Sequence, residues 1–531
     1  MNSLAGTASM LRLHLRRDRI VLPVWIALSS LPPLGVALGI AKLYPTPAAL
    51  RGFANECMSN PAIVGMLGPI LEPTPGAIVA WRTGVMGMLV GGIPSLLLVV
   101  RHTRGEEEKG RQELLEGSVM GRHAGLTAAL IVVMLSNLLL AALIAGALIS
   151  VGLSAAGSIA VGISWAAAGW MFAAIGAVTA QLTVTASVAN GLALWLFGGF
   201  FILRMVGDSG GERGPLAWVS WLSPLGWTRL TRPFAGERWW VFAMVVGFTA
   251  AMTAAAYALA SRRELGGGLL PLRAGRTAAA PSLSGPFALA WRLQRGMLFG
   301  WIGGFVALGV LLGAVGHNLT PLLDTATLNR WLAQIRAHDP AHAFLRLVIY
   351  TLGQVISAYA ILAVMKLREE ETAIRAEPIL ATAVSRARWA ASHLVFAAAG
   401  PALVLTASGL AIGLGYGVVT GNLSHEVPQM LATTLRTLPA VWVMGGIAML
   451  LIGAAPRYAN FTIWLVLASY LLLELAWELR QVGQSLFDLS PFAYVHWTLG
   501  QGSTASFAGL AVTAAALTAA GMLALGRRDI G

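Results

Sequence analysis

The chain has 531 residues, of which 57% are hydrophobic and 11% are charged. Soluble domains carry about 25% charged residues, so this composition excludes a soluble enzyme or binding module. The formal net charge of +13 would suit a nucleic acid. However, most Lys and Arg residues fall in loops on one side of the apolar runs, which is typical of cytoplasmic loops in membrane proteins. We therefore expect no nucleic-acid partner.

Apolar runs long enough to cross a bilayer recur along the chain. A hydrocarbon core about 30 Å thick requires about 20 apolar residues per helix, and about twelve runs meet this requirement. The predicted spans are residues 20–41, 79–100, 125–151, 158–182, 186–203, 239–260, 297–316, 347–365, 391–416, 437–456, 462–478 and 504–526. Their many Gly and Ala residues suit close helix packing in membranes. We predict an all-α polytopic protein of the cell membrane with both termini in the cytoplasm.

The segment before the first span has the pattern of an amphipathic helix. Its apolar stripe and the basic stripe beside it consist of Leu4, Ala8, Leu11 and Leu15, and of Arg12, Arg16 and Arg19. Such a helix can lie in the head-group layer with its arginines on lipid phosphates. Phe287, Trp291, Arg292 and Arg295 repeat the pattern more weakly. The alternative is an ordinary basic flank of a cytoplasmic span end.

Two charged stretches, residues 101–122 and 366–386, interrupt this apolar chain and match each other. Six charged residues coincide at one constant offset, and the matched pairs are Arg104/Arg368, Glu106/Glu370, Glu107/Glu371, Arg111/Arg375, Glu113/Glu377 and Arg122/Arg386. The sequences SRRELGGG, from Ser261, and GRRDIG, at the end of the chain, also match. These matches predict an internal duplication: a six-span unit at 1–265, a cytoplasmic linker at 266–289 and a second six-span unit at 290–531. An even number of spans gives both units the same orientation, as in parallel repeats.

Each charged stretch has the sequence of a short helix under the bilayer. Glu107 and Arg111 stand four residues apart with the acid first, as do Glu371 and Arg375, and this order supports a helix by only about 0.2–0.5 kcal/mol per pair. We expect the repeated charges to form two docking surfaces and to matter more for assembly than for folding. The alternative is a solvated hairpin between two spans.

Both stretches resemble the acidic coupling segment between the second and third spans of ABC-2 type permeases, roughly E-x-E-x-G-T-x-E-x-L-x-x-x-P-x-x-R. The doubled layout resembles the twelve-span actinobacterial members that export polyketide antibiotics or many drugs. The resemblance implies that Glu106, Glu108, Glu113, Glu370 and Glu377 contact ATP-binding subunits. The internal repeat adds Arg104, Glu107, Arg111, Arg368, Glu371 and Arg375 to this set. The sequence departs from the pattern at Arg111, Val119, Thr372 and Ile374.

The resemblance implies an ATP-driven exporter of hydrophobic or amphipathic compounds. ATP binding through a P-loop needs a Lys after Gly, but Lys42, Lys109 and Lys366 follow other residues. The chain is therefore expected to be a non-catalytic permease without a cofactor. Two copies of a separate subunit would bind ATP and Mg. The alternative is a secondary transporter of the major-facilitator kind, which would require coupling acids near mid-membrane and a different charged loop.

A few other residues are candidates for the substrate path or for a metal. Glu474 and Trp477 combine an acid and an aromatic ring at a span end, which could hold a cation, and Trp195 and Phe197 could line an apolar cavity. His338 and His342 stand four apart, but Pro340 lies between them, so we expect no metal site. Two outer segments, 218–227 and 488–497, share Ser-Pro followed by aromatics and are either re-entrant helices, by the same resemblance, or an aromatic belt. Cys57 is expected in an outer loop that solvent reaches.

Overall fold

A computed structural model describes residues 3–59, 61–108, 110, 120–209, 211–212, 214–264, 266–270, 283, 285–316, 340–478, 482–496 and 504–528. All regular secondary structure in these ranges is helical. Eleven helices there are long and apolar enough to cross a membrane, six before residue 275 and five after it. The predicted all-α polytopic membrane fold is confirmed.

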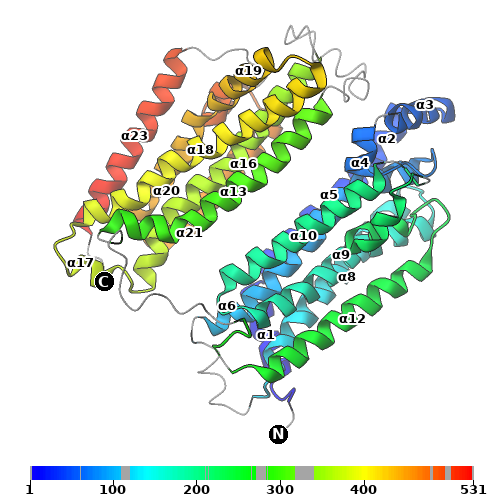
Figure 1. Cartoon of the computed structure of the whole chain (residues 1–531), viewed down its shortest axis with the longest axis horizontal. Coiled ribbons are helices and arrows are strands. Elements are labelled where there is room, and N and C mark those ends of the chain that lie inside the picture. The colour runs from blue at the N-terminus through cyan, green and yellow to red at the C-terminus, as the bar shows by residue number, and fades with distance from the viewer. Residues whose placement is uncertain are drawn as a thin grey trace. The chain divides into compact units, whose positions relative to one another are not determined.

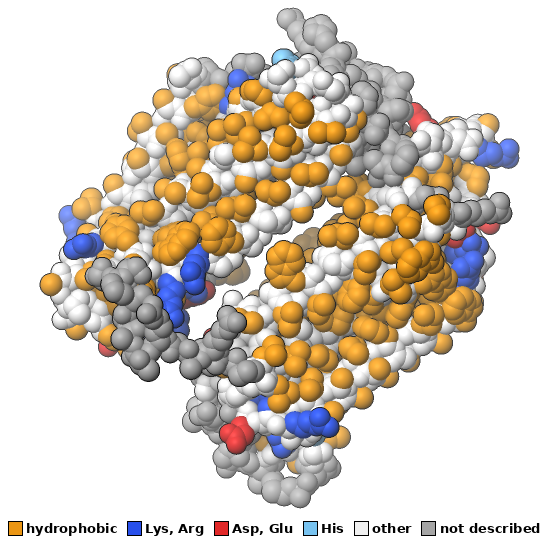
Figure 2. All heavy atoms as spheres, in the orientation of Figure 1, with side chains coloured by type: hydrophobic (Ala, Val, Ile, Leu, Met, Phe, Trp, Pro, Cys, Tyr) orange, Lys and Arg blue, Asp and Glu red, His pale blue; other side chains and the backbone are white. Residues whose placement is uncertain are grey.

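The chain forms two compact units, Met1–Gly275 and Arg276–Gly531. The division falls within the predicted linker 266–289, whose last residues already belong to a helix that begins at Pro286. Charged side chains gather toward the ends of the helices in each unit, and hydrophobic side chains cover their length (Figure 2). This distribution suits helices that lie in lipid, where polar groups are unfavourable.

Unit 1 comprises α1 (Thr7–Arg17), α2 (Val21–Leu43), α3 (Pro47–Met58), α4 (Pro61–Leu67), α5 (Pro75–His102), α6 (Arg104–Glu107), α8 (Ala124–Ser150), α9 (Ala155–Leu182), α10 (Ala186–Asp208), η1 (Ala217–Leu222), α11 (Pro224–Leu230) and α12 (Trp239–Arg262). The long helices run side by side, with α1 and α6 at one end and α3 and α4 at the other (Figure 1).

Helix α9 forms the centre of unit 1. It packs against α5, α8, α10 and α12, and small residues make this possible. A Cβ added at Gly162 would overlap the carbonyl oxygen of Ala141 on α8, so the two backbones approach as closely as glycine allows. Close approach through small residues is the usual way in which membrane helices gain packing energy.

Unit 2 comprises α13 (Pro286–Gly316), α16 (Pro340–Thr372), α17 (Glu377–Leu380), α18 (Arg386–Thr420), α19 (Leu423–Leu435), α20 (Leu438–Ala454), α21 (Pro456–Glu478), α22 (Gln484–Phe487), η4 (Pro491–Val495) and α23 (Thr504–Arg527). Helix α18 packs on α13, α16 and α19, and α20 packs on α16 and α23. In Figure 1, α17 and the C-terminus lie at one end of this unit and α19 at the other.

Every predicted span overlaps a helix of the structure. The predicted span 462–478 overlaps helix α21, but α21 is not among the eleven membrane-spanning candidates. Helix α21 begins earlier than predicted, at Pro456, and its first two turns contain the polar residues Arg457 and Asn460. Residues 475, 476 and 478 near its C-terminal end lie outside the residues whose side chains are described, so a layout of twelve spans stays a prediction.

Helix α1 forms where the amphipathic segment was predicted, and it turns a different face toward the protein. Met10 and His14 are its buried residues, whereas Leu4 and Leu15 are exposed. Leu4, Ala8 and Leu15 of the apolar stripe are therefore left on the outside, where they can contact lipid head groups and chains, whereas Leu11 packs against the core of unit 1.

Candidate functional site

The first charged stretch is built into unit 1 by a buried ion cluster. The Glu107 carboxylate accepts hydrogen bonds from Arg104 Nη1 at 2.8 Å and from Arg263 Nη2 at 2.5 Å. The side chains of Arg104, Glu107 and Arg263 are only 0%, 4% and 9% exposed. We call these three residues the first Arg–Glu–Arg cluster.

The remaining donors of the first cluster are also satisfied. Arg104 Nε donates to the carbonyl of Ala180 at 2.9 Å, and its Nη2 donates to the carbonyl of Gly267 at 2.8 Å. Arg263 Nε donates to Gln181 Oε1 at 2.7 Å. The cluster therefore links α6, which directly follows α5, to the end of α9 and to the tail after α12.

The second charged stretch repeats this arrangement in unit 2. The Glu371 carboxylate pairs with Arg368 Nη1 at 3.0 Å and accepts from Arg528 Nη2 at 2.6 Å. Arg368, Glu371 and Arg528, the second Arg–Glu–Arg cluster, have side chains that are 22%, 10% and 19% exposed. The second cluster joins the end of α16 to the tail after α23. Its side chains are more exposed to solvent than those of the first cluster.

A further hydrogen bond occurs in both units. Arg122 donates to the carbonyl of Arg263 at 2.6 Å, and Arg386 donates to the carbonyl of Arg528 at 2.7 Å. Each charged stretch is thus tied to its tail at both of its ends. Four matched positions per unit share these contacts, so the sequence match reflects a three-dimensional arrangement that is formed twice.

One of the two predicted ion pairs needs correction. Glu371 pairs with Arg368 and Arg528, whereas Arg375 pairs with Glu370 at 3.2 Å, so the predicted Glu371–Arg375 pair is wrong. Glu107 is held by Arg104 and Arg263, while Arg111, its predicted partner, lies outside the described residues, as does Glu113. Helix α16 ends at Thr372, so Arg375 does not lie one turn beyond Glu371 on the same helix.

Some charges of the first stretch are part of the fold of unit 1, whereas the expectation that these charges matter more for assembly than for folding stays a prediction. Glu106 and Glu107 are buried, and Glu106 pairs with Arg17 of α1 at 2.6 Å. Glu108 is exposed and accepts a hydrogen bond from the backbone N–H of Ala186, in the first turn of α10, at 3.0 Å. The carboxylate at this helix N-terminus is favourably placed for the helix dipole.

Other members of the second stretch remain accessible. Glu369, Arg375 and Glu377 are exposed, whereas Glu370 is buried. Residues Lys366–Thr372 continue α16 as one long helix, and Glu377 begins α17. The predicted short charged helix is therefore an extension of the span followed by a separate turn, and its exposed charges come from both.

A cavity of about 440 Å³ lies beside the first cluster. Glu107, Arg122 and Arg263 contribute to its wall, together with Glu264 and Gln181. Charged walls on both sides favour a polar occupant over an apolar one.

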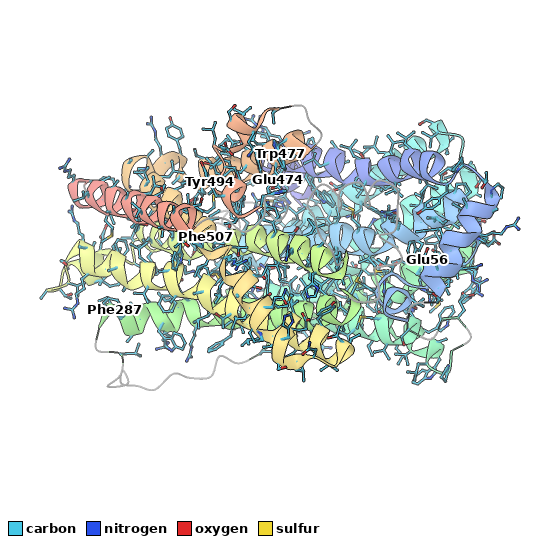
Figure 3. All side chains as sticks on the ribbon, turned by 90° about the horizontal axis from the view of Figure 1, so that it is seen from above. Glu56, Phe287, Glu474, Trp477, Tyr494 and Phe507 are labelled. Carbon is cyan, nitrogen blue, oxygen red and sulfur yellow. The ribbon has the colours of Figure 1, made fainter. Side chains whose placement is uncertain are left out.

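Beside the middle of α16, Glu474 belongs to a polar and aromatic cluster. Its carboxylate accepts a hydrogen bond from Gln354 and lies 3.8 Å from His496. Trp477, one turn further on α21 (Figure 3), stacks on Phe487 at 4.5 Å and contacts the edge of His496. Burial lowers the pKa of His496 to about 4, so this imidazole is neutral at pH 7. The structure brings Glu474 and Trp477 together around His496.

The other two candidates for the substrate path do not lie together. Trp195 is 76% exposed, whereas Phe197 is 5% exposed and packs on Phe172 with ring centroids 4.7 Å apart. Residues two apart on a helix face different directions, so Phe197 belongs to the core of unit 1 and Trp195 to its surface.

Of the two candidate metal-binding histidines, His338 lies outside the described residues, and His342 pairs with Glu426 at 3.0 Å. The segments at 218–227 and 488–497 contain short helices, η1 and α11 in unit 1 and η4 in unit 2. Whether they are re-entrant stays a prediction. Cys57 is only 1% exposed, so the expectation that solvent reaches it is wrong.

Among the features that sequence reasoning missed is a buried charge cluster formed by Arg204, Asp208 and Arg229. Asp208 accepts from Arg229 at 2.6 and 3.0 Å and lies 3.5 Å from Arg204. The available signal was the spacing of four residues between Arg204 and Asp208 in an apolar run, because ionisable residues within spans are usually paired.

Comparison with known proteins places this architecture in a family. Residues 283–525 match the family model described as the C-terminal domain of the multidrug efflux system permease Rv1217c. The chain is also 38% identical over 529 residues to the multidrug efflux system permease protein Rv1217c of Mycobacterium tuberculosis, an alignment that covers 99% of this chain and 95% of that protein. The chain therefore belongs to the family of multidrug efflux system permeases that includes Rv1217c.

Proposed function

We propose that the chain is the membrane subunit of an ABC-2 type exporter, driven by separate ATP-binding subunits. It would move hydrophobic or amphipathic compounds out across the plasma membrane. The observation that carries the proposal is the duplicated Arg–Glu–Arg cluster, which holds a charged stretch at the same point of each unit. Two equivalent, rigidly held stretches are what two copies of one partner need, because rigid contact surfaces lower the entropy lost on binding.

The exposed charges define where these subunits would dock. Among the described residues they are Glu369, Arg375 and Glu377 in unit 2, and Arg101, Glu108 and Arg122 in unit 1. The buried members, Arg104, Glu106, Glu107 and Glu370, would act by positioning this surface. The topology in this proposal puts the charged stretches and both termini in the cytoplasm, where ATP is available.

The experiment is co-purification from native membranes, with the bound protein identified by mass spectrometry. We expect the chain to retain an ATP-binding protein and to hydrolyse ATP only together with it. The double variant Glu369→Lys/Glu377→Lys should lose the partner, because like charges facing each other at an interface cost several kcal/mol. The matched control is Glu56→Lys/Glu72→Lys, which reverses two exposed acids outside the charged stretches. Glu56 belongs to α3, at the other end of unit 1 (Figure 1). Equal retention of the partner by all three proteins would contradict the docking surface.

A secondary transporter is the alternative, and one observation favours it. Glu474 is an acid at the end of a long helix with His496 as a neighbour, and such pairs occur in proton relays. Export that persists with a hydrolysis-deficient partner and collapses when an uncoupler removes the proton gradient would support this alternative.

A further inference from the structure

Helix α1 turns a basic face away from the core of unit 1. Arg12 and Arg16 stand one turn apart and are exposed, as is Arg19 in the turn that follows the helix. The first two each stand two residues after a buried one, Met10 or His14, and residues two apart on a helix point in different directions. Within the described part of the chain, none of the three arginines forms an ion pair.

Exposed leucines flank these arginines. Leu4, Leu13 and Leu15 are 45%, 38% and 47% exposed. Leucines beside arginines suit the head-group layer of a bilayer, where apolar side chains reach acyl chains and guanidinium groups reach lipid phosphates. A soluble anion would pair with the arginines but would leave the leucines in water. Each basic residue near an anionic bilayer surface raises affinity about fivefold, so the occupant that fits this face is an anionic lipid surface.

The opposite side of α1 is bound to the beginning of the first charged stretch. Arg17 Nη1 lies 2.6 Å from a carboxylate oxygen of Glu106. Asp18, which directly follows α1, is fully buried and lies 3.1 Å from Arg101 Nη1 and 2.5 Å from His102 Nε2. Helices α1 and α6 accordingly lie at the same end of unit 1 (Figure 1). A displacement of α1 would therefore break ion pairs that hold the start of this stretch.

The residues before α1 are bound to the other end of the same stretch. The backbone N–H of Gly121 donates to the carbonyl of Ala5 at 2.9 Å, and that of His123 donates to the carbonyl of Ser3 at 3.0 Å. Helix α1 also packs on α8, which begins just after this point. The N-terminal segment therefore braces the first charged stretch at both of its ends.

The corresponding segment of unit 2 has different contacts. The sequence RRDR at 16–19 corresponds to RLQR at 292–295, so Leu293 and Gln294 replace the two residues that pair with the first stretch. Leucine forms no ion pair, and Gln294 Nε2 lies 3.0 Å from His393 Nδ1, on α18. Among the described residues, no ion pair or hydrogen bond joins the start of α13 to the second charged stretch. Only the first stretch is braced in this way in the described structure.

We propose that α1 binds anionic lipid head groups through Arg12, Arg16 and Arg19, and that this binding fixes the first charged stretch in place. The second charged stretch would not respond, because the start of α13 does not share these contacts. The docking surface of unit 1, but not that of unit 2, would then depend on the lipid composition of the membrane. Only this consequence for docking rests on the proposed function.

The first test measures which lipid lies beside α1. In a Cys57→Ala background, Ser9→Cys places a bimane label at an exposed position of α1, and the full chain is inserted into phosphatidylcholine nanodiscs. A doxyl quencher near the top of the acyl chain is carried by phosphatidylglycerol or by phosphatidylcholine. We expect the phosphatidylglycerol form to quench about tenfold more effectively, less than three fivefold factors combined because phosphatidylcholine also carries a phosphate. Raising the salt from about 0.1 M to about 1 M should remove most of this preference, since charges are then screened within about 3 Å.

Three variants make this test specific to the arginines. Arg12→Gln/Arg16→Gln/Arg19→Gln should be quenched equally by both lipids, whereas the matched triple Lys variant keeps the charges and should keep most of the preference. The changed side chains are exposed, so an unchanged melting temperature is expected for both. The control probe is Leu139→Cys on α8, at a position that is 52% exposed, where both lipids should quench equally.

The second test follows the first charged stretch itself by hydrogen–deuterium exchange. The amides of Glu106, Glu107 and Glu108 are bonded to carbonyls at the start of α6. Adding phosphatidylglycerol to the nanodiscs should slow their exchange about threefold in the wild type. The triple Gln variant should show no such effect, and Arg17→Gln should show a smaller one with lipid binding intact. The amides of α17 in unit 2 are the internal control and should not respond.

The outcomes separate this proposal from the proposed function. Equal quenching by both lipids at Ser9→Cys would overturn the lipid face and leave the arginines to a soluble anion or a protein. A lipid preference without any effect on α6 would overturn the hold on the charged stretch. Both tests use the chain without its partner, so neither result bears on ATP-driven export. Conversely, failure to retain an ATP-binding protein would contradict the proposed function and leave a lipid-dependent α6 unexplained by docking but intact.

Discussion

Glu107 and Arg263 lie 156 residues apart in the chain, yet their side chains form a bidentate ion pair with N···O distances of 2.8 and 2.5 Å. Glu371 and Arg528, 157 residues apart, form the matching pair in the second unit. In each unit, the charged stretch at the end of the second predicted span is therefore bound to the tail that follows the last helix, α12 or α23. A movement of one stretch would be transmitted directly to the tail and to the helix before it.

Neutralising the central acid should destabilise unit 1 more than unit 2. Glu107→Gln leaves two guanidinium groups almost fully buried without their counter-charge, and breaking such a buried pair costs about 3–5 kcal/mol. Glu371→Gln acts on side chains that are 10–22% exposed, where water offsets part of the loss, so about 1–2 kcal/mol is expected. Melting temperatures of the purified proteins in one detergent would measure the difference.

The control for this pair is Glu377→Gln, which removes an exposed carboxylate and should leave the melting temperature unchanged. The double variant Glu107→Gln/Arg263→Gln should recover part of the loss, because it also removes an unpaired buried charge. Equal melting temperatures for wild type and Glu107→Gln would show that the first cluster is not a stabilising element.

Acidification should destabilise unit 1 through His14. Burial, with His102 stacked at 4.1 Å, lowers the pKa of His14 from 6.5 to about 4. The unfolded chain therefore binds more protons than the folded chain between pH 6.5 and 4, so stability falls as the pH decreases through this window. The loss from this group at pH 5 is about 2 kcal/mol.

The variant His14→Phe keeps a ring against His102 and removes the titrating nitrogen atoms. Melting temperatures measured from pH 7.5 to pH 5 should fall less steeply for this variant than for wild type. Identical slopes for the two proteins would mean that His14 does not contribute to the acid sensitivity. Asp18 does not confuse this comparison, because its pKa, lowered chiefly by its hydrogen bond to His102 against the opposing effect of burial, places its transition below 3.8.

Native Cys57 should react slowly with maleimide reagents. It is buried within α3, and burial raises the pKa of its thiol to about 12, so almost no thiolate, the reactive form, is present at pH 7. Labelling should become complete only after denaturation in sodium dodecyl sulfate. Rapid labelling of the folded protein would contradict this packing of α3.

This inert thiol makes topology measurable in a Cys57→Ala background. Cysteine placed at Glu72, an exposed residue at the α3 end of unit 1, should react with an impermeant maleimide added to intact cells. Cysteine placed at Gly110 or Thr372 should react only after the membrane is permeabilised. The reverse pattern would invert the proposed orientation.

The sequence predicted the positions of the helices better than the contacts of the charged residues. Span positions follow from continuous apolar length, which is a local property, and all of them overlap helices. One partner of Glu107, Arg104, is three residues away, but the other, Arg263, is not local. Arg263 could have been proposed by noting that Glu107 and Arg263 both have matches in the second half, Glu371 and Arg528, but the spacing of four to Arg111 favoured the nearer residue.

Burial explains the other differences. The cluster of Arg204, Asp208 and Arg229 was missed because charged residues near span ends are often placed toward water, and these are turned inward by the short helices η1 and α11. Trp195 and Phe197 were grouped as aromatic residues, yet their helical positions separate them into surface and core. Composition identifies such residues, but only the packing of neighbouring helices determines which way each one faces.

The close contact of α8 and α9 leads to a last prediction. Because a Cβ at Gly162 would overlap the backbone carbonyl of Ala141, Gly162→Ala must push two helices apart along their whole contact. Such overpacking costs about 1–3 kcal/mol. Gly146→Ala, where an added Cβ meets open space, is the matched control, and it should stabilise α8 by up to about 1 kcal/mol because Ala favours helix over Gly. Opposite shifts of the melting temperature are therefore expected for the same chemical change on neighbouring helices. A Gly162→Ala protein as stable as wild type would mean that α8 and α9 pack less closely than described, and that the central position of α9 does not depend on small residues.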